Sequence, residues 1–325
     1  MTIRSHPYRG EADFRRMRTF LIKARVRGQY GYWHIGDLVW RLLLQSCDGD
    51  PAQNLNLWED EAGDLLGFAG YYRSQSFDLQ VHPDYRQSAL AEEMLDWIEA
   101  RWQNDLTSNK TTRDSLPVQE GSATRLSPDE GVYETDVNLI TLLNRRGYEQ
   151  RPGDQVLMVR PLDGPVPEPA LPDGFTVRAV SGEGEAGERS DAHREAFGSR
   201  RVTVEAYQRL MRSSGYDRDL DVVAVAPDGR CAAFCLGWID PVNGIGELEP
   251  VGTRPDFRHL GLGQTVMLEG LRRMKSRGLQ EVIVGPVKDK LIPFYEPVGF
   301  RVRCKTYNFY KEKPSQTDVA RRNHL

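Results

Sequence analysis

The sequence of 325 residues predicts an α/β fold in two tandem copies, each with a mixed, mostly antiparallel sheet flanked by helices. Three observations predict it. A proline-rich segment divides the chain, the two halves repeat each other's motifs, and the second half passes from hairpin strands to a strand–helix–strand order. The chain is long enough for about two domains.

The proline-rich segment sets the predicted domain boundaries. Five prolines fall between positions 161 and 172, and such a density favours a stiff linker over a helix or a central strand. We therefore expect a first domain over residues 1–160, a linker over 161–174, a second domain over 175–313 and a polar tail over 314–325.

Two motifs recur in the halves. Pro83-Asp84-Tyr85-Arg86 returns as Pro255-Asp256-Phe257-Arg258, each time between a strand-like run and a helical pattern. The segment 143–148 matches 295–300, where a helix turns at glycine into a strand. The interval between the motifs is longer in the first half, which predicts a loop insertion near Thr107 to Pro128.

The elements of the second half follow from periodicity and turn residues. We expect, in order, a strand at 175–180, helices at 188–197 and 204–212, strands at 221–226 and 231–239, a strand at 246–253, a helix at 262–277, a strand at 281–285, a helix at 291–298 and a strand at 300–310. The turn Pro227-Asp228-Gly229 predicts a hairpin, and Gly278 suits the end of the long helix.

Composition excludes several classes of protein. The 43 Lys and Arg nearly balance the 47 Asp and Glu, so the net charge of −4 predicts neither a nucleic-acid nor a membrane partner. No apolar run is long enough to span a bilayer, and the N-terminus lacks the apolar region of a signal peptide. The four cysteines form no CxxC pair and the six histidines are scattered. We expect reduced core thiols, no metal site and a cytoplasmic protein.

A glycine-containing loop is the sharpest feature. Arg258-His259-Leu260-Gly261-Leu262-Gly263 stands where a strand meets a helix, so free backbone N–H groups at the helix start can bind a pyrophosphate. A P-loop would need Gly-Lys-Ser/Thr, and a dinucleotide fingerprint would need glycine instead of Val266. A purely structural glycine turn remains the alternative.

The loop and a second motif together resemble one family. R-x-x-G-x-G, followed by Phe294-Tyr295-Glu296-Pro297-Val298-Gly299-Phe300, resembles motifs A and B of the GNAT superfamily of N-acetyltransferases. Because the first half repeats the layout, the resemblance covers essentially the whole chain. The tandem arrangement is similar to that of mycothiol synthase-like and other two-domain bacterial members.

The resemblance implies acetyl-CoA as acyl donor and a set of residues that hold it. The strand end would bind the pantetheine arm and the loop amides the pyrophosphate, which gives the set Val251, Gly252, Thr253, Arg258, His259, Leu260, Gly261, Leu262, Gly263 and Gln264. Many members carry Asn where this chain has Lys288, so that contact departs from the pattern, although Lys288 could meet a phosphate.

Two prolines support the same site independently. Pro250 and Pro286 lie in neighbouring predicted strands, although proline cannot donate to a sheet ladder. Both fit if the strands splay apart and the cofactor's amides fill the gap. Ordinary edge or bulge prolines are the alternative.

Three side chains are catalytic candidates. Glu247 and Glu249 share one strand face, and the resemblance implies a general base there, which an ammonium with a pKa near 10 requires. The residues do not decide between them, and cation-binding or surface carboxylates are the alternative. The resemblance places the acid that protonates the thiolate at Tyr295, which could instead be a buried aromatic residue.

The first half lacks these groups. The positions aligned with Gly261, Gly263, Glu247, Glu249 and Tyr295 hold Ala89, Ala91, Gln75, Phe77 and Leu143. We interpret residues 1–160 as a degenerate copy that packs on the active one. Its aromatic residues either line the acceptor cleft or pack between the domains: Tyr30, Tyr32, Trp33 and Trp40.

The expected function is transfer of acetyl, or another short acyl group, from coenzyme A to a primary amine by direct attack in the second domain. The acceptor is a small molecule or a peptide, and Asp240 beside the Glu pair weakly favours a cationic one. The chain is a monomer or a homodimer. A non-catalytic acyl-CoA sensor or partner-binding module is the main alternative. A net charge of −4 disfavours a third, an aminoacyl-tRNA-dependent ligase.

Overall fold

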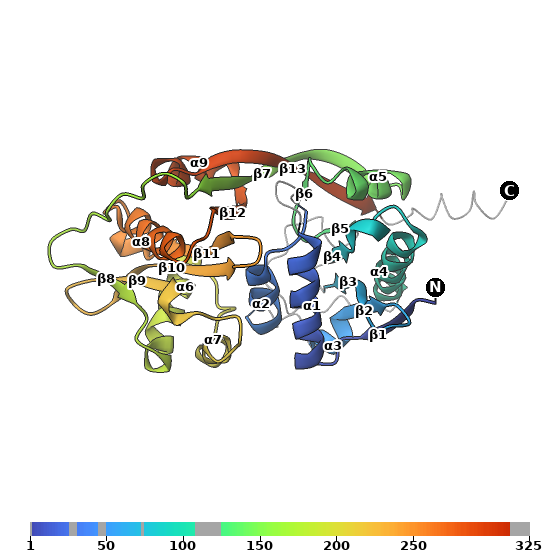
Figure 1. The fold of residues 1–325 in the computed structure, drawn as a ribbon, viewed down its shortest axis with the longest axis horizontal. Helices are drawn as coiled ribbons and strands as arrows, with labels where there is room; N and C mark the ends of the chain where they lie inside the picture. The colour runs from blue at the N-terminus through green and yellow to red at the C-terminus, as the bar shows by residue number, and fades with distance from the viewer. Residues whose placement is uncertain (1, 26–30, 45–49, 73–74, 108–124, 313–325) are drawn as a thin grey trace.

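The computed structural model describes residues 2–25, 31–44, 50–72, 75–107 and 125–312. Within these ranges the strands form one 13-stranded sheet that carries two lobes (Figure 1). The centre of the predicted loop insertion, the polar tail, Tyr30 and Cys47 lie outside the described residues.

The first half forms one lobe of mixed strands and helices. Its elements are β1 Arg4–Pro7, α1 Glu11–Ala24, α2 Ile35–Leu43, α3 Pro51–Asn54, β2 Leu55–Glu59, β3 Leu65–Tyr71, β4 Ser76–Val81, α4 Ala89–Thr107, β5 Arg125–Pro128, β6 Val132–Tyr133, α5 Val137–Arg145 and β7 Glu149–Pro161.

The second half repeats this order, with short 3₁₀ turns at corresponding places before α4 and α8. Its elements are β8 Thr176–Ala179, α6 Ala186–Phe197, α7 Val204–Met211, β9 Asp221–Val225, β10 Cys231–Asp240, β11 Ile245–Thr253, α8 Leu262–Ser276, β12 Glu281–Lys288, α9 Ile292–Tyr295 and β13 Arg301–Glu312. The predicted order of strands and helices is confirmed.

Two predicted boundaries in the second half are wrong. The helix expected over 291–298 is the short α9 between 3₁₀ turns, because Pro293 and Pro297 lack the N–H groups that a longer helix needs. The strand expected to end at Gly285 continues to Lys288, because Val287 and Lys288 pair with Val156 and Gln155 of β7.

The strand order is nearly palindromic and shows the duplication. It runs β1-β2-β3-β4-β5-β13-β7-β12-β11-β10-β9-β8, with β6 paired to β13. The pairs β4–β5 and β11–β12 are parallel and the other pairs are antiparallel. The predicted mixed, mostly antiparallel sheet is therefore confirmed.

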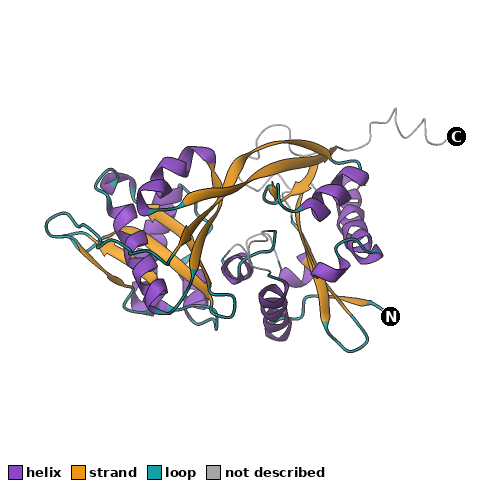
Figure 2. Ribbon diagram, turned by 45° about the horizontal axis from the view of Figure 1, so that its top comes forward, coloured by secondary structure: helices purple, strands orange, loops and turns teal. Residues whose placement is uncertain are grey.

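The two halves exchange their final strands. β7, which ends the first half, pairs with β12 through contacts such as Val282 opposite Arg160. β13, which ends the second half, pairs with β5 through Lys311 opposite Leu126. β7 and β13 also pair with each other and bridge the two lobes (Figure 2). The domain boundaries read from the proline-rich segment stay a prediction, and the sheet runs across them.

β11 and β12 separate after three residue pairs. Their parallel register pairs Ile245 with Glu281, Gly246 with Val282 and Glu247 with Ile283. Pro250 and Pro286 follow beyond this register, on the portions of the strands that point toward α8 and α9. The predicted splay of these strands is confirmed. That a cofactor fills the gap stays a prediction.

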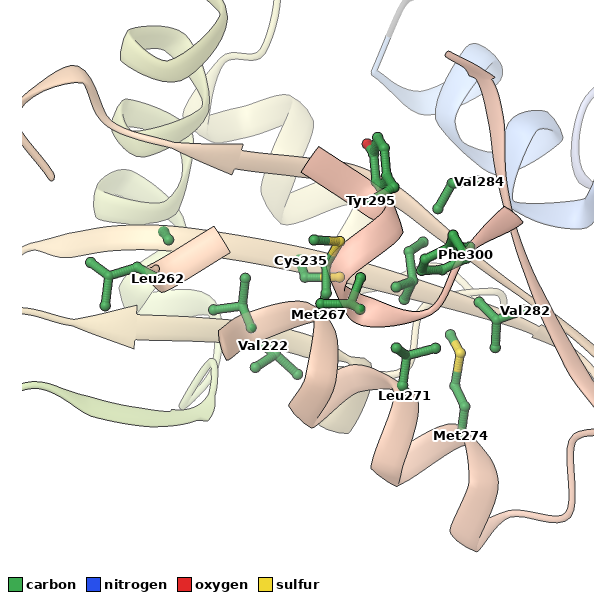
Figure 3. Packing of buried hydrophobic residues seen from close by; sticks show 14 of the residues in the cluster. Val222, Cys235, Leu262, Met267, Leu271, Met274, Val282, Val284, Tyr295 and Phe300 are labelled. Atoms are coloured by element: carbon green, nitrogen blue, oxygen red, sulfur yellow. The ribbon is translucent and has the colours of Figure 1, made fainter. Parts of the chain in front are cut away.

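Three large apolar clusters hold the lobes. One lies between α8 and the sheet of the second half (Figure 3), and a corresponding one lies under α4 of the first half. The third spans both halves, because α2 packs on α6, α7 and β10 of the second half, while α1 packs on α2 and β3. Trp40 of α2, for example, lies 5.4 Å from the ring of His193 in α6.

The thiols agree with the sequence analysis. Cys231, Cys235 and Cys304 are buried and free of disulfides, as predicted for core cysteines. Among the described residues, no helix combines the length and the apolar character that a membrane crossing requires.

Gly36 tests how tightly α2 packs on the second half. A Cβ at this position would lie 2.6 Å from Glu247 Oε2 and would also strike the Trp238 ring. Because well-packed contacts resist added atoms, we expect Gly36→Ala to lower the free energy of unfolding by about 1–3 kcal/mol. The matched control is Gly187→Ala in α6, where a Cβ meets nothing within 4 Å. It should instead stabilise the protein by about 0.5–1 kcal/mol. Urea unfolding of both variants measures this, and equal effects would contradict the packing argument.

Candidate active site

The glycine loop presents backbone N–H groups at the start of α8. Arg258 to Gly261 are exposed, and α8 begins at Leu262. Gly261 adopts a φ of 76°, and as glycine it provides no side-chain acceptor for the first amides of the helix. The first i→i−4 bond of this turn runs from Thr265 N–H to the Gly261 carbonyl. The N-terminal end of α8 therefore offers the free backbone N–H groups that bind an anionic group.

The loop residues predicted to bind the pyrophosphate differ in whether their backbone groups are free. The N–H of Arg258 already donates to the Pro255 carbonyl at 3.3 Å, and its guanidinium donates to the Ala196 carbonyl at 3.2 Å. His259 has a φ of 65°, which is unusual for a residue with a side chain. The backbone of Arg258 is thus used by the fold, whereas His259, Leu260 and Gly261 are exposed to solvent and Leu262 and Gly263 are buried.

Tight packing brings the strand end, the loop and α9 together. A Cβ on Gly263 would lie 2.8 Å from the Phe294 ring and 3.2 Å from Thr253 Oγ1. A Cβ on Gly252 would strike the Phe234 ring. Gly263 lets the start of α8 approach Thr253 at the end of β11, and Gly252 makes room for the Phe234 ring of the neighbouring strand β10.

The corresponding helix start in the first half, that of α4, has hydrogen-bond acceptors for its backbone N–H groups. Ser88 Oγ accepts the N–H of Leu90 at 3.2 Å, and the Ser88 carbonyl accepts the N–H of Ala91. Leu143, aligned with Tyr295, is fully buried in the core of its lobe. The geometry therefore supports a degenerate first copy.

Lys288 lies at the exposed end of β12. Its Nζ is 3.9 Å from Asp154 Oδ2, a carboxylate on the exchanged strand β7. This neighbour weakens the sequence-based expectation of a phosphate contact, because the ammonium has a carboxylate close by. The contact stays a prediction.

Tyr295 packs at the edge of the second-half core. Its ring makes edge contacts with Phe294 and Phe300, and its hydroxyl is directed away from α8 (Figure 3). Burial raises the pKa of Tyr295, and Cys235 and Glu249 nearby raise it further. The phenol therefore stays protonated at neutral pH and can donate a proton.

Glu247 is buried at the junction of the halves. Its side chain is 1% exposed, and neither carboxylate oxygen accepts a hydrogen bond from the described residues. His34 Nδ1 lies 3.1 Å from Oε2, but that nitrogen already accepts the Gly36 N–H as the cap of α2. Burial raises the pKa of Glu247 to about 8, against the opposing charges of Arg25 and Arg41.

His34 is a neutral partner. Burial lowers the pKa of His34 to about 3, and Arg25 lowers it further. Because Nδ1 accepts a hydrogen bond, the ring proton is on Nε2. Nδ1 has a single lone pair, which the Gly36 N–H already occupies, so the ring lies against Glu247 without a hydrogen bond to it.

Asp37 joins the two glutamates in a carboxylate cluster. Asp37, Glu247 and Glu249 each place an oxygen within 4.8 Å of the others, a spacing at which a cation could bind. Burial and Glu247 raise the pKa of Asp37 to about 6. Burial and both neighbouring acids also raise the pKa of Glu249. Three carboxyls at this spacing cannot all be ionised without a compensating cation.

A cavity opens from this cluster between the halves. Glu247, Ile283 and Pro286 line it from the second half, next to the point where β11 and β12 separate. The first half provides most of the wall, including Arg25, Tyr32, Trp33, His34, Asp37, Asp78, Glu130 and Tyr133. Of the predicted aromatic residues, Tyr32 and Trp33 thus line the cavity, whereas Trp40 packs in the apolar cluster between the lobes.

Asp240 has a structural role that the sequence did not indicate. Its carboxylate accepts the N–H groups of Val242 and Asn243 and the Asn243 side chain, and so closes the β10–β11 turn. Asn243 also donates to the Ile22 carbonyl of α1 at 3.0 Å. Asp240 therefore positions the lobes and gives no support for a cationic acceptor.

Sequence reasoning missed the residues that the first half contributes to the site. His34, Asp37, Asp78 and Glu130 lie in no catalytic motif. The spacing of His34 and Asp37 was a usable signal, because together they form a capping box at the start of α2. That signal places a helix start, but it does not say that the helix faces Glu247.

Comparisons with known proteins agree with the fold and with the family resemblance seen in the sequence. Residues 189–300 match the model of the acetyltransferase (GNAT) family. The mycothiol acetyltransferase of Paenarthrobacter aurescens is 26% identical over 277 residues, which cover 81% of this chain and 76% of that protein. The mycothiol acetyltransferase of Saccharomonospora viridis is 31% identical over 150 residues, which cover 41% of this chain and 48% of that protein.

Solved structures share the fold over nearly the whole chain. A tandem GNAT protein from the clavulanic acid biosynthesis pathway superposes with a TM-score of 0.64 at 15% identity, covering 97% of this chain and all of that one. A GCN5-related N-acetyltransferase from Sphaerobacter thermophilus gives a TM-score of 0.61 at 22% identity, with 96% of each chain covered. Motifs, duplicated topology and relatives agree: the second half carries a domain of the acetyltransferase (GNAT) family, and the chain as a whole has the fold of tandem GNAT proteins.

Proposed function

We propose that this chain transfers acetyl, or another short acyl group, from coenzyme A to a primary amine, with the reacting groups in the second half. The observation that carries the proposal is Glu247. This carboxyl accepts no hydrogen bond from the described residues, although it is buried, and it lines a cavity where β11 and β12 separate. Buried polar groups without partners are rare and mark functional positions.

The donor would bind along the end of β11 and the start of α8. The amides of His259 to Gln264 suit the pyrophosphate, because Gly261 leaves the helix end open. Val251, Gly252 and Thr253 lie past the last pair between β11 and β12, so their backbone groups can meet the amides of the pantetheine arm. The acyl-CoA supplies a thioester whose carbonyl carbon is open to attack.

Glu247 would accept the proton that the acceptor ammonium must lose before it attacks. The raised pKa of this carboxyl, about 8, lies close to that of an amine, and such a match favours proton transfer. Glu249 and Asp37 adjoin it and can share the proton. We assign the base to Glu247 rather than Glu249 because Glu247 lines the cavity.

Tyr295 would return a proton to the departing thiolate. The new bond joins the amine nitrogen to the carbonyl carbon, and the bond from that carbon to sulfur breaks. An ammonium loses two protons on becoming an amide. Glu247 takes the first before the attack and later releases it to solvent. The phenol of Tyr295 protonates the sulfur, and the second proton from the nitrogen restores the phenol. The N–H of Val251 is our candidate donor to the thioester carbonyl. Metal-free chemistry suffices for these steps.

Replacing the base tests its assignment. We expect Glu247→Gln to lower kcat by roughly 10²–10⁴-fold with the KM for acetyl-CoA unchanged, because the amide cannot take a proton. Wild-type kcat/KM should rise with pH through about 8, where Glu247 becomes ionised. In the variant the remaining activity should follow the amine's own pKa, near 10. Glu249→Gln is the matched comparison, and a larger loss in that variant would move the base to Glu249. Release of free thiol with an amine panel gives the rates.

The acid is tested separately. Tyr295→Phe keeps the ring and its contacts with Phe294 and Phe300 but removes the proton. We expect kcat to fall by about 10²-fold with an unchanged melting temperature. Unchanged turnover in an active preparation would remove Tyr295 from the mechanism.

The donor site is tested by charge alone. Both Asn and Asp tolerate the left-handed conformation of Gly261. Gly261→Asp places a carboxylate at the helix end and should raise the KM for acetyl-CoA at least about tenfold above that of Gly261→Asn, through repulsion of the phosphates. Equal KM values would place the diphosphate elsewhere. Calorimetric binding of acetyl-CoA without turnover of any amine would instead favour a sensor.

A further inference from the structure

The cavity between the halves is lined by more carboxyl groups than the fold pairs with cations. Its lining includes the carboxyls of Asp37, Asp78, Glu130 and Glu247, while Arg25 is the guanidinium among the described lining residues. Asp136 also lines the cavity, but it is paired with Arg86 at 2.8 Å and caps α5. The other four carboxyls have no such dedicated cation.

The guanidinium of Arg41 pairs with three acids of the first half. Arg41 lies 3.2 Å from Asp78, 2.7 Å from Glu130 and also pairs with Asp129. A single positive charge cannot neutralise three carboxylates. Burial raises the pKa of both Asp78 and Glu130 to about 7, although Arg41 opposes the effect. The single charge of Arg41 is thus shared among its three acidic partners.

The four acids form two pairs on different elements, and both pairs line one cavity. Glu247 and Asp37 stand where β11 meets α2, and Glu247 is the buried side chain whose oxygens lack a hydrogen-bond donor. Asp78 lies on β4, and Glu130 follows β5, in the first half. Aromatic side chains of Tyr32, Trp33 and Tyr133 lie in the same lining and can cover the methylenes of an acceptor.

Resting on the proposed function, we propose that the acceptor carries at least two positively charged nitrogens. One amine would meet Glu247 and Asp37, where it loses its proton and is acylated. A second ammonium or guanidinium, kept charged, would be held by Asp78 and Glu130. Asp78 and Glu130 are then specificity residues contributed by the half that has lost its own cofactor site.

Matched amines test the proposal on the wild-type protein. Cadaverine has two amines, pentylamine has one on the same carbon chain, and aminopentanol replaces the second amine with a neutral hydroxyl. With acetyl-CoA saturating, we expect kcat/KM for cadaverine at least about tenfold above both others, and spermidine should exceed them as well. Equal rates, or a preference for pentylamine, would overturn the proposal.

Variants locate the second charge. Glu130 is 34% exposed on its side chain, so Glu130→Gln should fold. We expect Glu130→Gln and Asp78→Asn each to reduce the cadaverine-to-pentylamine ratio of kcat/KM by roughly 5–10-fold, mainly through the KM for cadaverine. Asp173→Asn removes an exposed acid outside the cavity lining and should leave the ratio unchanged. An unchanged ratio in Glu130→Gln would overturn the assignment.

Two further results separate this inference from the proposed function. If no amine is acetylated, the proposed function fails, and calorimetry with cadaverine on the wild type and Glu130→Gln still decides the binding proposal. Cadaverine binding that weakens in the variant would support it, and absent binding would overturn it. If EDTA abolishes activity and a divalent cation restores it and raises the melting temperature, the carboxylates hold a metal ion rather than the acceptor, and the proposal falls.

Discussion

The exchange of β7 and β13 is the constraint on which the rest of the structure depends. Each strand completes the sheet of the opposite half, so the lobes cannot separate without breaking both ladders. Main-chain pairing over this length holds the lobes in one orientation. α2 is thereby pressed against β10 and β11, close enough that only glycine fits at position 36. The cavity and its acidic cluster exist because this orientation is fixed.

Burying several ionised carboxylates together is unfavourable. In the Asp37, Glu247 and Glu249 cluster, protonation of the carboxyls reduces this repulsion. His34 stays uncharged beside Glu247 and so adds no positive charge to the cluster. Raised pKa values at Asp37, Glu247 and Glu249 have the same origin in burial and mutual repulsion. The protein therefore has proton-accepting groups whose affinity for protons lies near neutral pH, as proton transfer from an amine requires.

Local signals were enough to predict much of the fold. The α8 pattern, the Pro227-Asp228-Gly229 turn and the repeated Pro-Asp-aromatic-Arg motif each concern a few neighbouring residues, and the structure has the elements they predict. Pro250 and Pro286 predicted the splay because a missing donor has a direct effect on a ladder. Long-range pairing gave no such signal. Nothing in residues 149–161 says that they pair with 281–288, and so the strand exchange was missed.

The site divides in the same way. Glu247, Glu249 and Tyr295 stand in or beside motifs, whereas Asp37, Asp78 and Glu130 reach the cavity only through the packing of the other lobe. Asp240 misled the sequence reasoning because an acid near a site and an acid that closes a turn look the same in one dimension. Burial and hydrogen bonding distinguish them.

The Ser88 cap has a consequence for how such a chain can change. Ser88 already accepts one of the N–H groups at the start of α4, and under the proposed function this lobe does not bind the donor, so its surface is released from the requirements of donor recognition. Under the proposed function, one lobe keeps an invariant task while the other supplies the acceptor wall. Substitutions in the acceptor wall would then change which amine is accepted without disturbing the binding of the thioester. Two identical active lobes could not vary in this way, because each would have to keep its own donor site.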